Sequence, residues 1–221
     1  MSELRLEPAI DLQLLVLIGG GEFSFGETRE IDEFLLAARG ERKQIAFLPT
    51  ASGSNEYATH IGKYFSEIDP SSETQNVPVY RGRDNRRQKN LNTILEAGLL
   101  YVGGGVASRL IETVRESPAE LAMRDAAARG TVIAAMGASA ASLGLHTWDG
   151  RGGTMPALGW LAGTVIEPAF NPADDTHLRR LMSLPDVSLG IGIPPSTALA
   201  VRGDGSTQVI GEGSIAVFRK R

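Results

Sequence analysis

The sequence predicts a doubly wound α/β fold in which a mostly parallel sheet ends in an antiparallel C-terminal hairpin. Short, continuous apolar segments alternate with segments whose apolar residues recur at helical spacing, the pattern of a parallel sheet covered on both faces. The end of the chain differs, because strand-like segments there flank the turn Asp204-Gly205. With 221 residues and no linker rich in Pro, Gly and Ser, residues 1–221 are expected to form a single domain.

Each expected element follows from its local pattern. Uninterrupted apolar runs predict buried strands at residues 13–18, 44–48, 77–80, 99–102 and 131–136. Apolar positions at helical spacing predict helices at 31–38, at 56–68 and between Gly105 and Arg115. The C-terminal hairpin or meander is expected from strands at 198–202, 208–211 and 215–219.

The composition is that of a folded protein without thiol chemistry. The net charge of −4 argues against nucleic acid or an anionic membrane as the main partner. There is no cysteine, which excludes disulfides, a cysteine nucleophile and thiolate metal sites. No apolar run is long enough to span a bilayer, and the first residues lack the basic start of a secretory signal. We therefore expect a cytoplasmic protein.

Turns rich in small residues follow four predicted strands, at the edge where open α/β sheets bind ligands. They are residues 19–21, 49–52, 103–105 and 137–141. The first turn has the glycine spacing of a phosphate-binding loop, but Glu27 stands where such a loop needs lysine, so we exclude nucleotide triphosphate binding. No G-x-G-x-x-G motif follows a strand with the right spacing, which argues against a dinucleotide cofactor.

Ser139 stands in a pattern typical of a nucleophile elbow. The strand at 131–136 runs into Gly137-x-Ser139, and Ala140 and Ala141 then begin a helix of small residues. In such an elbow the serine hydroxyl is exposed at a sharp turn, and the next backbone N–H helps to bind an oxyanion. Ala141 occupies the position where the motif usually has glycine. The alternative is that Ser139 only caps the helix.

Several segments together resemble peptidase family S51, which includes aspartyl dipeptidase (peptidase E) and cyanophycinase. The matching segments keep their order and spacing along nearly the whole chain, at residues 17–22, 45–52, 101–105, 137–141, 156–161, 180–181, 190–193 and 197–199. The resemblance implies a flavodoxin-type sheet like that of class I glutamine amidotransferases, in agreement with the apolar pattern. It also implies serine-dependent hydrolysis of short or unusual peptides beside an acidic residue. We expect neither a cofactor nor a metal.

The resemblance assigns roles at the predicted ligand-binding edge. It makes Ser139 the nucleophile, and it makes the backbone N–H of Ala140 and one from the Gly104-Gly105 turn the oxyanion donors. Two catalytic partners do not match. The family has histidine in a motif of acid or asparagine, any residue, His and Phe, and residues 167–170 carry alanine at that position, Ala169. No acid lies at 154–156, where the acidic partner is expected.

A serine hydroxyl is a weak nucleophile without an adjacent base, so another histidine would have to replace the missing one. His146 lies too far along a continuing helix from Ser139, and His60 fits an exposed helix position. His177 is the best candidate, since it lies at an expected helix start close to Ala169. The alternative for His177 is an exposed polar residue.

Two further charged residues are candidates for substrate binding. Arg180 matches a carboxylate with its planar guanidinium, and Glu167 would bind substrate or orient a base. The alternative for Arg180 is a solvated charge on a helix.

Two function classes stay open. One is an S51-type serine peptidase with an altered base, which cleaves small acidic peptides or isopeptides. The other is a non-catalytic relative that binds a small peptide, amino acid or metabolite in the same crevice. Since members of the family occur as monomers and dimers, the resemblance leaves a homodimer open.

Overall fold

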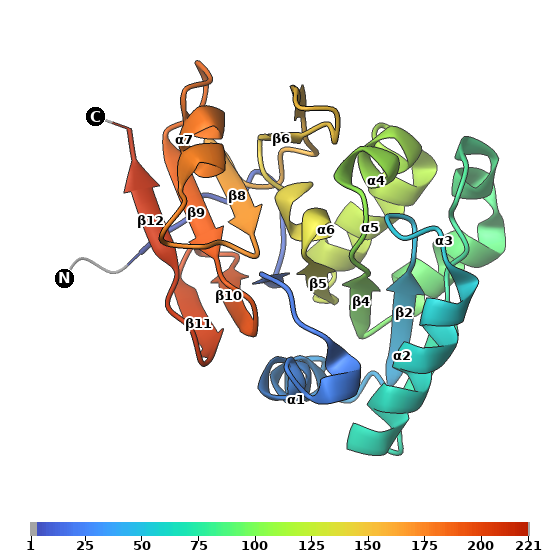
Figure 1. Cartoon of the computed structure of the whole chain (residues 1–221). Helices are drawn as coiled ribbons and strands as arrows, with labels where there is room; N and C mark the ends of the chain where they lie inside the picture. The colour runs from blue at the N-terminus through green and yellow to red at the C-terminus, as the bar shows by residue number, and fades with distance from the viewer. Residues whose placement is uncertain (1–3, 221) are drawn as a thin grey trace.

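The computed structural model describes residues 4–220, and its centre is a mostly parallel sheet (Figure 1). In this part of the chain the sheet has seven strands in the order β11-β10-β1-β5-β4-β2-β3. The parallel strands are β1 (Leu14–Ile18), β2 (Gln44–Leu48), β3 (Glu73–Asn76), β4 (Leu99–Val102) and β5 (Val132–Met136). The antiparallel hairpin of β10 (Thr197–Arg202) and β11 (Thr207–Gly211) adds to β1. The predicted fold class is confirmed.

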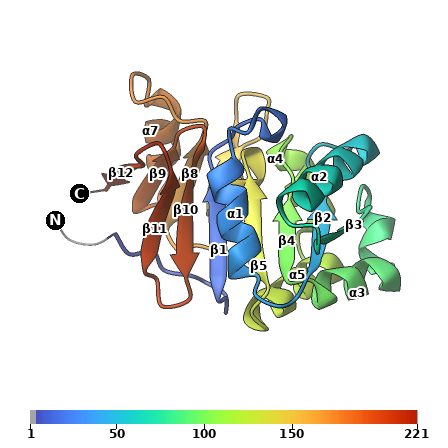
Figure 2. The same ribbon diagram turned by 90° about the horizontal axis from the view of Figure 1, so that it is seen from below.

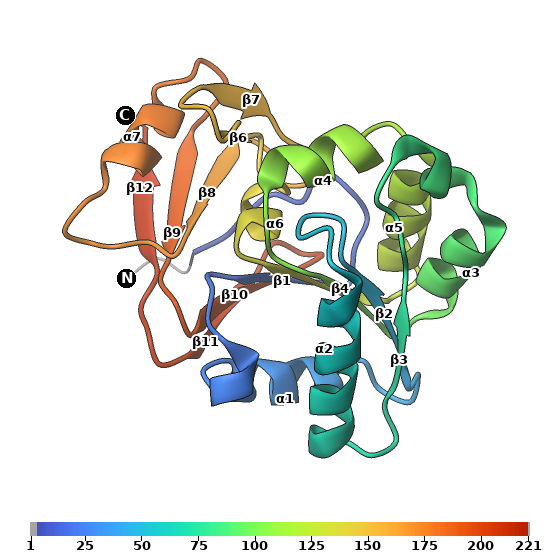
Figure 3. The ribbon, with the colours of Figure 1, turned by 45° about the vertical axis from the view of Figure 1, so that its right-hand side comes forward.

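Helices cover both faces of this sheet (Figure 3). One face carries α1 (Arg29–Ala38) and α2 (Asn55–Ile68), preceded in the chain by the 3-10 turn η1 (Phe23–Phe25). The other face carries η2 (Gly82–Arg86), α3 (Gln88–Glu96), α4 (Ala107–Val114), α5 (Pro118–Ala128) and α6 (Ala138–Ala141).

Side chains that point alternately to the two faces of the sheet explain this arrangement of helix, sheet and helix layers. In β1, Val16 and Ile18 pack with Ile31 of α1, whereas Leu15 and Leu17 belong to the core cluster on the opposite face. Because successive side chains of a strand point to opposite faces, an uninterrupted apolar strand requires a helix layer on each side.

A smaller three-stranded sheet stands beside the C-terminal hairpin (Figure 2). It contains β8 (Thr164–Pro168), β9 (Leu189–Ile193) and β12 (Ala216–Arg219), and α7 (Thr176–Met182) packs on it. Strands β6 (His146–Trp148) and β7 (Thr154–Pro156) form a separate hairpin. The predicted third strand of the C-terminal meander therefore pairs elsewhere, because β12 runs antiparallel to β9 and not to β11.

The strand predicted at 77–80 is wrong in its position. The structure has β3 at Glu73–Asn76, an edge strand paired only with β2, so most of its side chains face water and are polar. Val77 and Val79 are fully buried in the connection that follows, which gave that segment its strand-like apolar pattern. No helix among residues 4–220 is both long and apolar enough to cross a membrane.

Candidate functional site

Strand β5 ends at a sharp turn whose tip is Gly137. Gly137 has φ 56° and ψ −122° and directly precedes the four-residue helix α6. A Cβ atom at this position would have no other heavy atom within 4 Å, so a side chain there would extend into open space. This is the geometry of a nucleophile elbow, which holds one residue outward on a strained turn from strand to helix. The residue held outward here has no side chain.

Ser139 lies two residues further along, within α6, and its hydroxyl is not exposed. The residue is 0% exposed, and Oγ donates a hydrogen bond to the carbonyl oxygen of Gly103 at 2.7 Å. The expectation of an exposed hydroxyl at Ser139 is therefore wrong. The reason is the register of the turn, because the outward position comes directly after Met136, the last strand residue, and the helix has turned inward by Ser139.

A spacing signal for this register is present in the sequence. An elbow has small residues two positions before and two positions after its tip, because the strand and the helix approach closely there. Ala135 and Ser139 stand in those two positions when Gly137 is the tip. Counting from the end of the buried strand, rather than from the first glycine, would have placed the turn correctly.

The backbone N–H groups around the tip differ in their availability. The amide of Ala140 donates to Gly137 O at 2.9 Å, so the helix already uses the group that we expected to bind an oxyanion. In residues 4–220, no hydrogen bond uses the amides of Gly104, Gly105 or Ala138. Gly104 lies beside the elbow, since a Cβ on it would be 3.3 Å from Cγ of Met136.

The turn after β4 packs tightly on the turn after β2. Gly105 has φ 148°, and a Cβ there would lie 2.3 Å from the carbonyl carbon of Ala51, which only glycine avoids. The amide of Val106 donates to Ala51 O at 3.0 Å, and Arg109 Nη1 donates to Ser52 O at 2.7 Å. These contacts fix the loop that carries the free amides.

Ala169 follows β8 and contacts the first glycine turn. It has φ 51°, an unusual value for a residue with a Cβ, and its amide donates to Gly19 O at 2.7 Å. The end of β8 is therefore held against the end of β1, at the carboxyl edge of the central sheet.

The three charged candidates from the sequence gather around Trp148 of β6. The imidazole ring of His177 lies 4.9 Å from the indole ring, and the guanidinium of Arg180 lies over the indole at 5.1 Å. His177 Nδ1 is 3.8 Å from Oε1 of Glu167, and its side chain is 71% exposed. Arg180 Nη2 donates to Gly152 O at 3.3 Å. His177 thus faces Glu167, whereas the hydroxyl of Ser139 faces Gly103.

The carboxylate of Glu167 is largely removed from water, with 19% of its side chain exposed. Burial raises the pKa of Glu167, and the charge of nearby His177 and the indole of Trp148 offset only part of that rise. Trp148 Nε1 is buried and makes no hydrogen bond of ordinary geometry with residues 4–220, and its weaker interaction with the carboxylate of Glu167 lowers the pKa of that group.

A cavity of about 300 Å³ connects the elbow with this group of side chains. Four segments supply most of its walls: the loop after β4, helix α6, the end of β6 and the end of β8. The lining includes Val106, Ala138, Ala141, Trp148, Glu167 and Pro168. An apolar pocket with a few convergent polar groups is the usual form of a small-molecule site.

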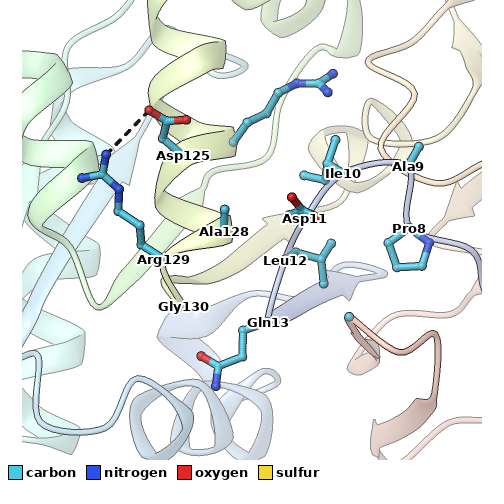
Figure 4. Close-up of a pocket in the computed structure, with 12 residues that line it drawn as sticks. Pro8, Ala9, Ile10, Asp11, Leu12, Gln13, Asp125, Ala128, Arg129 and Gly130 are labelled. Carbon is cyan, nitrogen blue, oxygen red and sulfur yellow. Dashed lines mark ion pairs between the residues drawn. The ribbon is translucent and has the colours of Figure 1, made fainter.

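A larger cavity of about 1010 Å³ lies at the other edge of the sheet (Figure 4). Gln13 precedes β1 and Gly130 precedes β5, so this cavity adjoins the amino ends of those strands. It is lined partly by the ion pair of Asp125 with Arg129, whose side chains lie 3.9 Å apart. Since ligands of open α/β sheets bind at the carboxyl ends, the smaller cavity is the candidate site. Among residues 4–220, no three His, Asp or Glu side chains are placed to hold a metal ion.

Comparisons with known proteins agree with this arrangement. The family described as "Peptidase family S51" matches residues 15–209. This chain belongs to peptidase family S51.

Curated relatives of this S51 member include peptidases from two bacterial groups. The uncharacterized peptidase YgaJ of Bacillus subtilis (strain 168) is 29% identical over an alignment of 133 positions that covers 58% of this chain and 55% of that protein. The cyanophycinase of Trichormus variabilis is 28% identical over an alignment of 234 positions that covers 97% of this chain and 76% of that protein. The crystal structure of a peptidase from an acI-B1 Actinobacterium has the same fold, with a TM-score of 0.80 at 24% identity over 94% of this chain and 91% of that one.

Two positions set this S51 member apart from the family pattern described above. The elbow tip is Gly137, and Ala169 stands where the family motif has histidine. In β7, Thr154, Met155 and Pro156 supply no carboxylate. Neither Gly137 nor Ala169 therefore supplies a hydroxyl or an imidazole in this chain.

Proposed function

We propose that this S51 member binds a small peptide or an amino-acid-like ligand in the crevice at the elbow, and that it does not hydrolyse that ligand through Ser139. One observation carries the proposal: the outward residue of the elbow is Gly137, and the Ser139 hydroxyl is buried on Gly103 O. A nucleophile must reach the scissile carbonyl and an adjacent base, and Ser139 Oγ has neither exposure nor a base.

The crevice keeps the features needed to bind a ligand. The cavity of about 300 Å³ is large enough for a small peptide or amino acid. The unused amides of Gly104, Gly105 and Ala138 would donate to a carbonyl or carboxylate oxygen of that ligand.

Arg180 is the proposed partner of a ligand carboxylate. It makes no ion pair with a carboxylate among the described residues, whereas its neighbour Arg179 is paired with Asp175 at 2.7 Å. The guanidinium of Arg180 is exposed beside Trp148, which lines the cavity.

The test is binding combined with chemistry on one panel of free dipeptides, including Asp-X and X-Asp members. We expect calorimetric binding, no hydrolysis, and no reaction of Ser139 with a fluorophosphonate. Val106→Trp fills the cavity from an exposed position and should abolish binding, whereas Leu121→Trp, exposed on α5, should not. Fluorophosphonate labelling or hydrolysis that Ser139→Ala removes would establish the peptidase alternative. Failure of the whole panel to bind would refute the proposal that the crevice binds such ligands.

A further inference from the structure

A cavity of about 520 Å³ lies between η1 and α2, on the face of the sheet that carries α1. Among the described residues it shares no lining residue with the crevice at the elbow. We call it the aromatic cleft, and its lining includes Glu22, Phe23, Tyr57, Lys63, Tyr64 and Glu67. The aromatic cleft is therefore a separate place where the protein can hold a ligand.

Three aromatic rings form a contiguous row in this cleft. The ring centroid of Phe23 lies 5.7 Å from that of Tyr57 and 5.2 Å from that of Tyr64. Tyr57 packs edge-on against Phe47 at 5.1 Å, and the Tyr64 hydroxyl donates to Asp32 at 2.8 Å. These contacts fix the two tyrosines before any ligand arrives. Because the face of an aromatic ring carries partial negative charge, a group of rings attracts a cation.

Carboxylates lie close to these rings. Glu22 is on the cleft wall, where its Oε1 accepts from the amide and the hydroxyl of Ser24, at 3.2 and 2.7 Å. Burial raises the pKa of Tyr57 to about 12, and the negative charges of Glu22 and Asp32 add to the rise. The same charges that disfavour a phenolate at Tyr57 favour a cation beside it.

The cleft has a positive group of its own, but that group does not cover the rings. Lys63 is the only lysine or arginine that residues 4–220 contribute to the lining. Its side chain is 81% exposed, and Nζ lies 3.9 Å from Oε1 of Glu67, so the pair stays hydrated and contributes little. In the described part of the chain, the guanidinium groups that stack on rings use Trp148, Trp160 and Phe218, and none uses a ring of the aromatic cleft.

We propose that the aromatic cleft binds an organic cation of the quaternary ammonium class. Such a cation has no N–H group to donate and is weakly hydrated, so aromatic faces and nearby carboxylates suffice to recognise it. A primary ammonium would need acceptors for three N–H groups. Glu22 Oε1 and Asp32 Oδ2 each already accept two hydrogen bonds. This site is independent of the peptide-binding function proposed above.

The experiment compares choline with neohexyl alcohol, a neutral molecule of the same shape in which carbon replaces the charged nitrogen. Proton NMR titration of the ligand methyl groups measures both affinities. We expect choline to bind at least about threefold more tightly, with methyl signals shifted upfield by the ring currents of the aromatic wall. Phe23→Leu should weaken choline binding about two- to fivefold. Phe25→Leu, on the same turn but 81% exposed and outside the cleft, is the matched control.

A gain of affinity cannot result from a damaged fold, so Lys63→Gln supplies an independent test. Removal of this exposed positive charge should tighten choline binding about twofold, whereas Lys89→Gln on α3 should not. Val106→Trp should leave choline binding unchanged, because it fills the crevice and not the aromatic cleft.

Four results would each overturn the cation site. They are no binding of choline, equal affinity for choline and neohexyl alcohol, no gain in Lys63→Gln, and loss of choline binding in Val106→Trp, which would place the ligand in the crevice. Unchanged affinity in Phe23→Leu would exclude the ring surface as its location, and the melting temperature checks that this variant is folded. Phe23→Leu should bind the dipeptide panel as the wild type does, so failure of the cation site leaves the peptide crevice in place.

Discussion

The hydroxyl of Ser139 donates to the carbonyl oxygen of Gly103 at 2.7 Å, and this bond joins α6 to the loop after β4. Both ends of the bond belong to segments that form the crevice wall. Ser139 therefore holds two walls of the crevice together through a buried hydrogen bond. The position that points outward from the elbow is Gly137.

Ser139→Ala should destabilise the fold without changing ligand binding by more than a small factor. The variant leaves Gly103 O without its buried donor, which should cost about 1 to 3 kcal/mol of the free energy of unfolding. Urea denaturation measures this cost. Ser66→Ala, which removes an exposed helix serine, should cost much less. Equal losses in the two variants would show that the Ser139 bond contributes little.

Single thiols can distinguish the tip of the elbow from its buried side, because the chain has no cysteine of its own. The Gly137→Cys thiol should react with a maleimide at nearly the rate of a free thiol, since a side chain there meets open space. The Ser139→Cys thiol should react at least about tenfold more slowly, since it requires local opening. The cost of a side chain at φ 56° should be about 1 to 2 kcal/mol, so Gly137→Cys should remain folded. Faster labelling at position 139 would reverse our assignment of the tip.

Much of the fold could be predicted from the sequence because its strands are buried on both faces. The expected strands at 44–48 and 99–102 have the same bounds as β2 and β4. The apolar pattern does not predict α5. The buried face of this helix consists largely of alanines such as Ala122 and Ala126, which differ little in hydrophobicity from the residues beside them. It also misplaces β3, because an edge strand needs few apolar residues.

The candidate site was less accessible to sequence reasoning, for two physical reasons. A shift of two residues decides whether a side chain at a turn points outward or inward, and a short motif such as G-x-S does not fix that register. The group around Trp148 is assembled from β6, β8 and α7, so its members meet only through the tertiary fold. Glu167, His177 and Arg180 were each named from the sequence, but their common contact with Trp148 required the structure.

The stability of the protein should depend on the ionisation of Asp32. Asp32 lies on the buried face of α1, where it accepts hydrogen bonds from Thr28 Oγ1 at 2.7 Å and from Tyr64 at 2.8 Å. Burial raises the pKa of Asp32 from 3.8 to about 6, and these hydrogen bonds offset part of the rise. The folded state therefore holds its proton more tightly than the unfolded state, so stability is lost as the pH rises from about 4 to about 6.

Asp32→Asn tests this dependence because asparagine does not ionise. Relative to wild type, the free energy of unfolding of Asp32→Asn should increase by about 2 to 3 kcal/mol between pH 4 and pH 7, the equivalent of a shift of about two pKa units. Urea titrations across that range measure the difference, with exposed Asp11→Asn as the control. A difference that stays constant with pH would mean that Asp32 titrates alike in the folded and unfolded states.

Gly105→Ala should damage both stability and the crevice. The added Cβ would lie 2.3 Å from the carbonyl carbon of Ala51, and φ of 148° is unfavourable for any residue with a Cβ. Because the obstructing atoms are backbone, the two turns must move apart, which should cost at least about 2 kcal/mol. Movement of these turns also displaces the free amides and Val106, so affinity for the dipeptide panel should fall together with the melting temperature. Gly82→Ala, whose Cβ would contact nothing within 4 Å, should leave both unchanged. Full binding by a destabilised Gly105→Ala protein would show that the ligand does not use this loop, since the substitution acts directly on the packing that holds its amides toward the elbow.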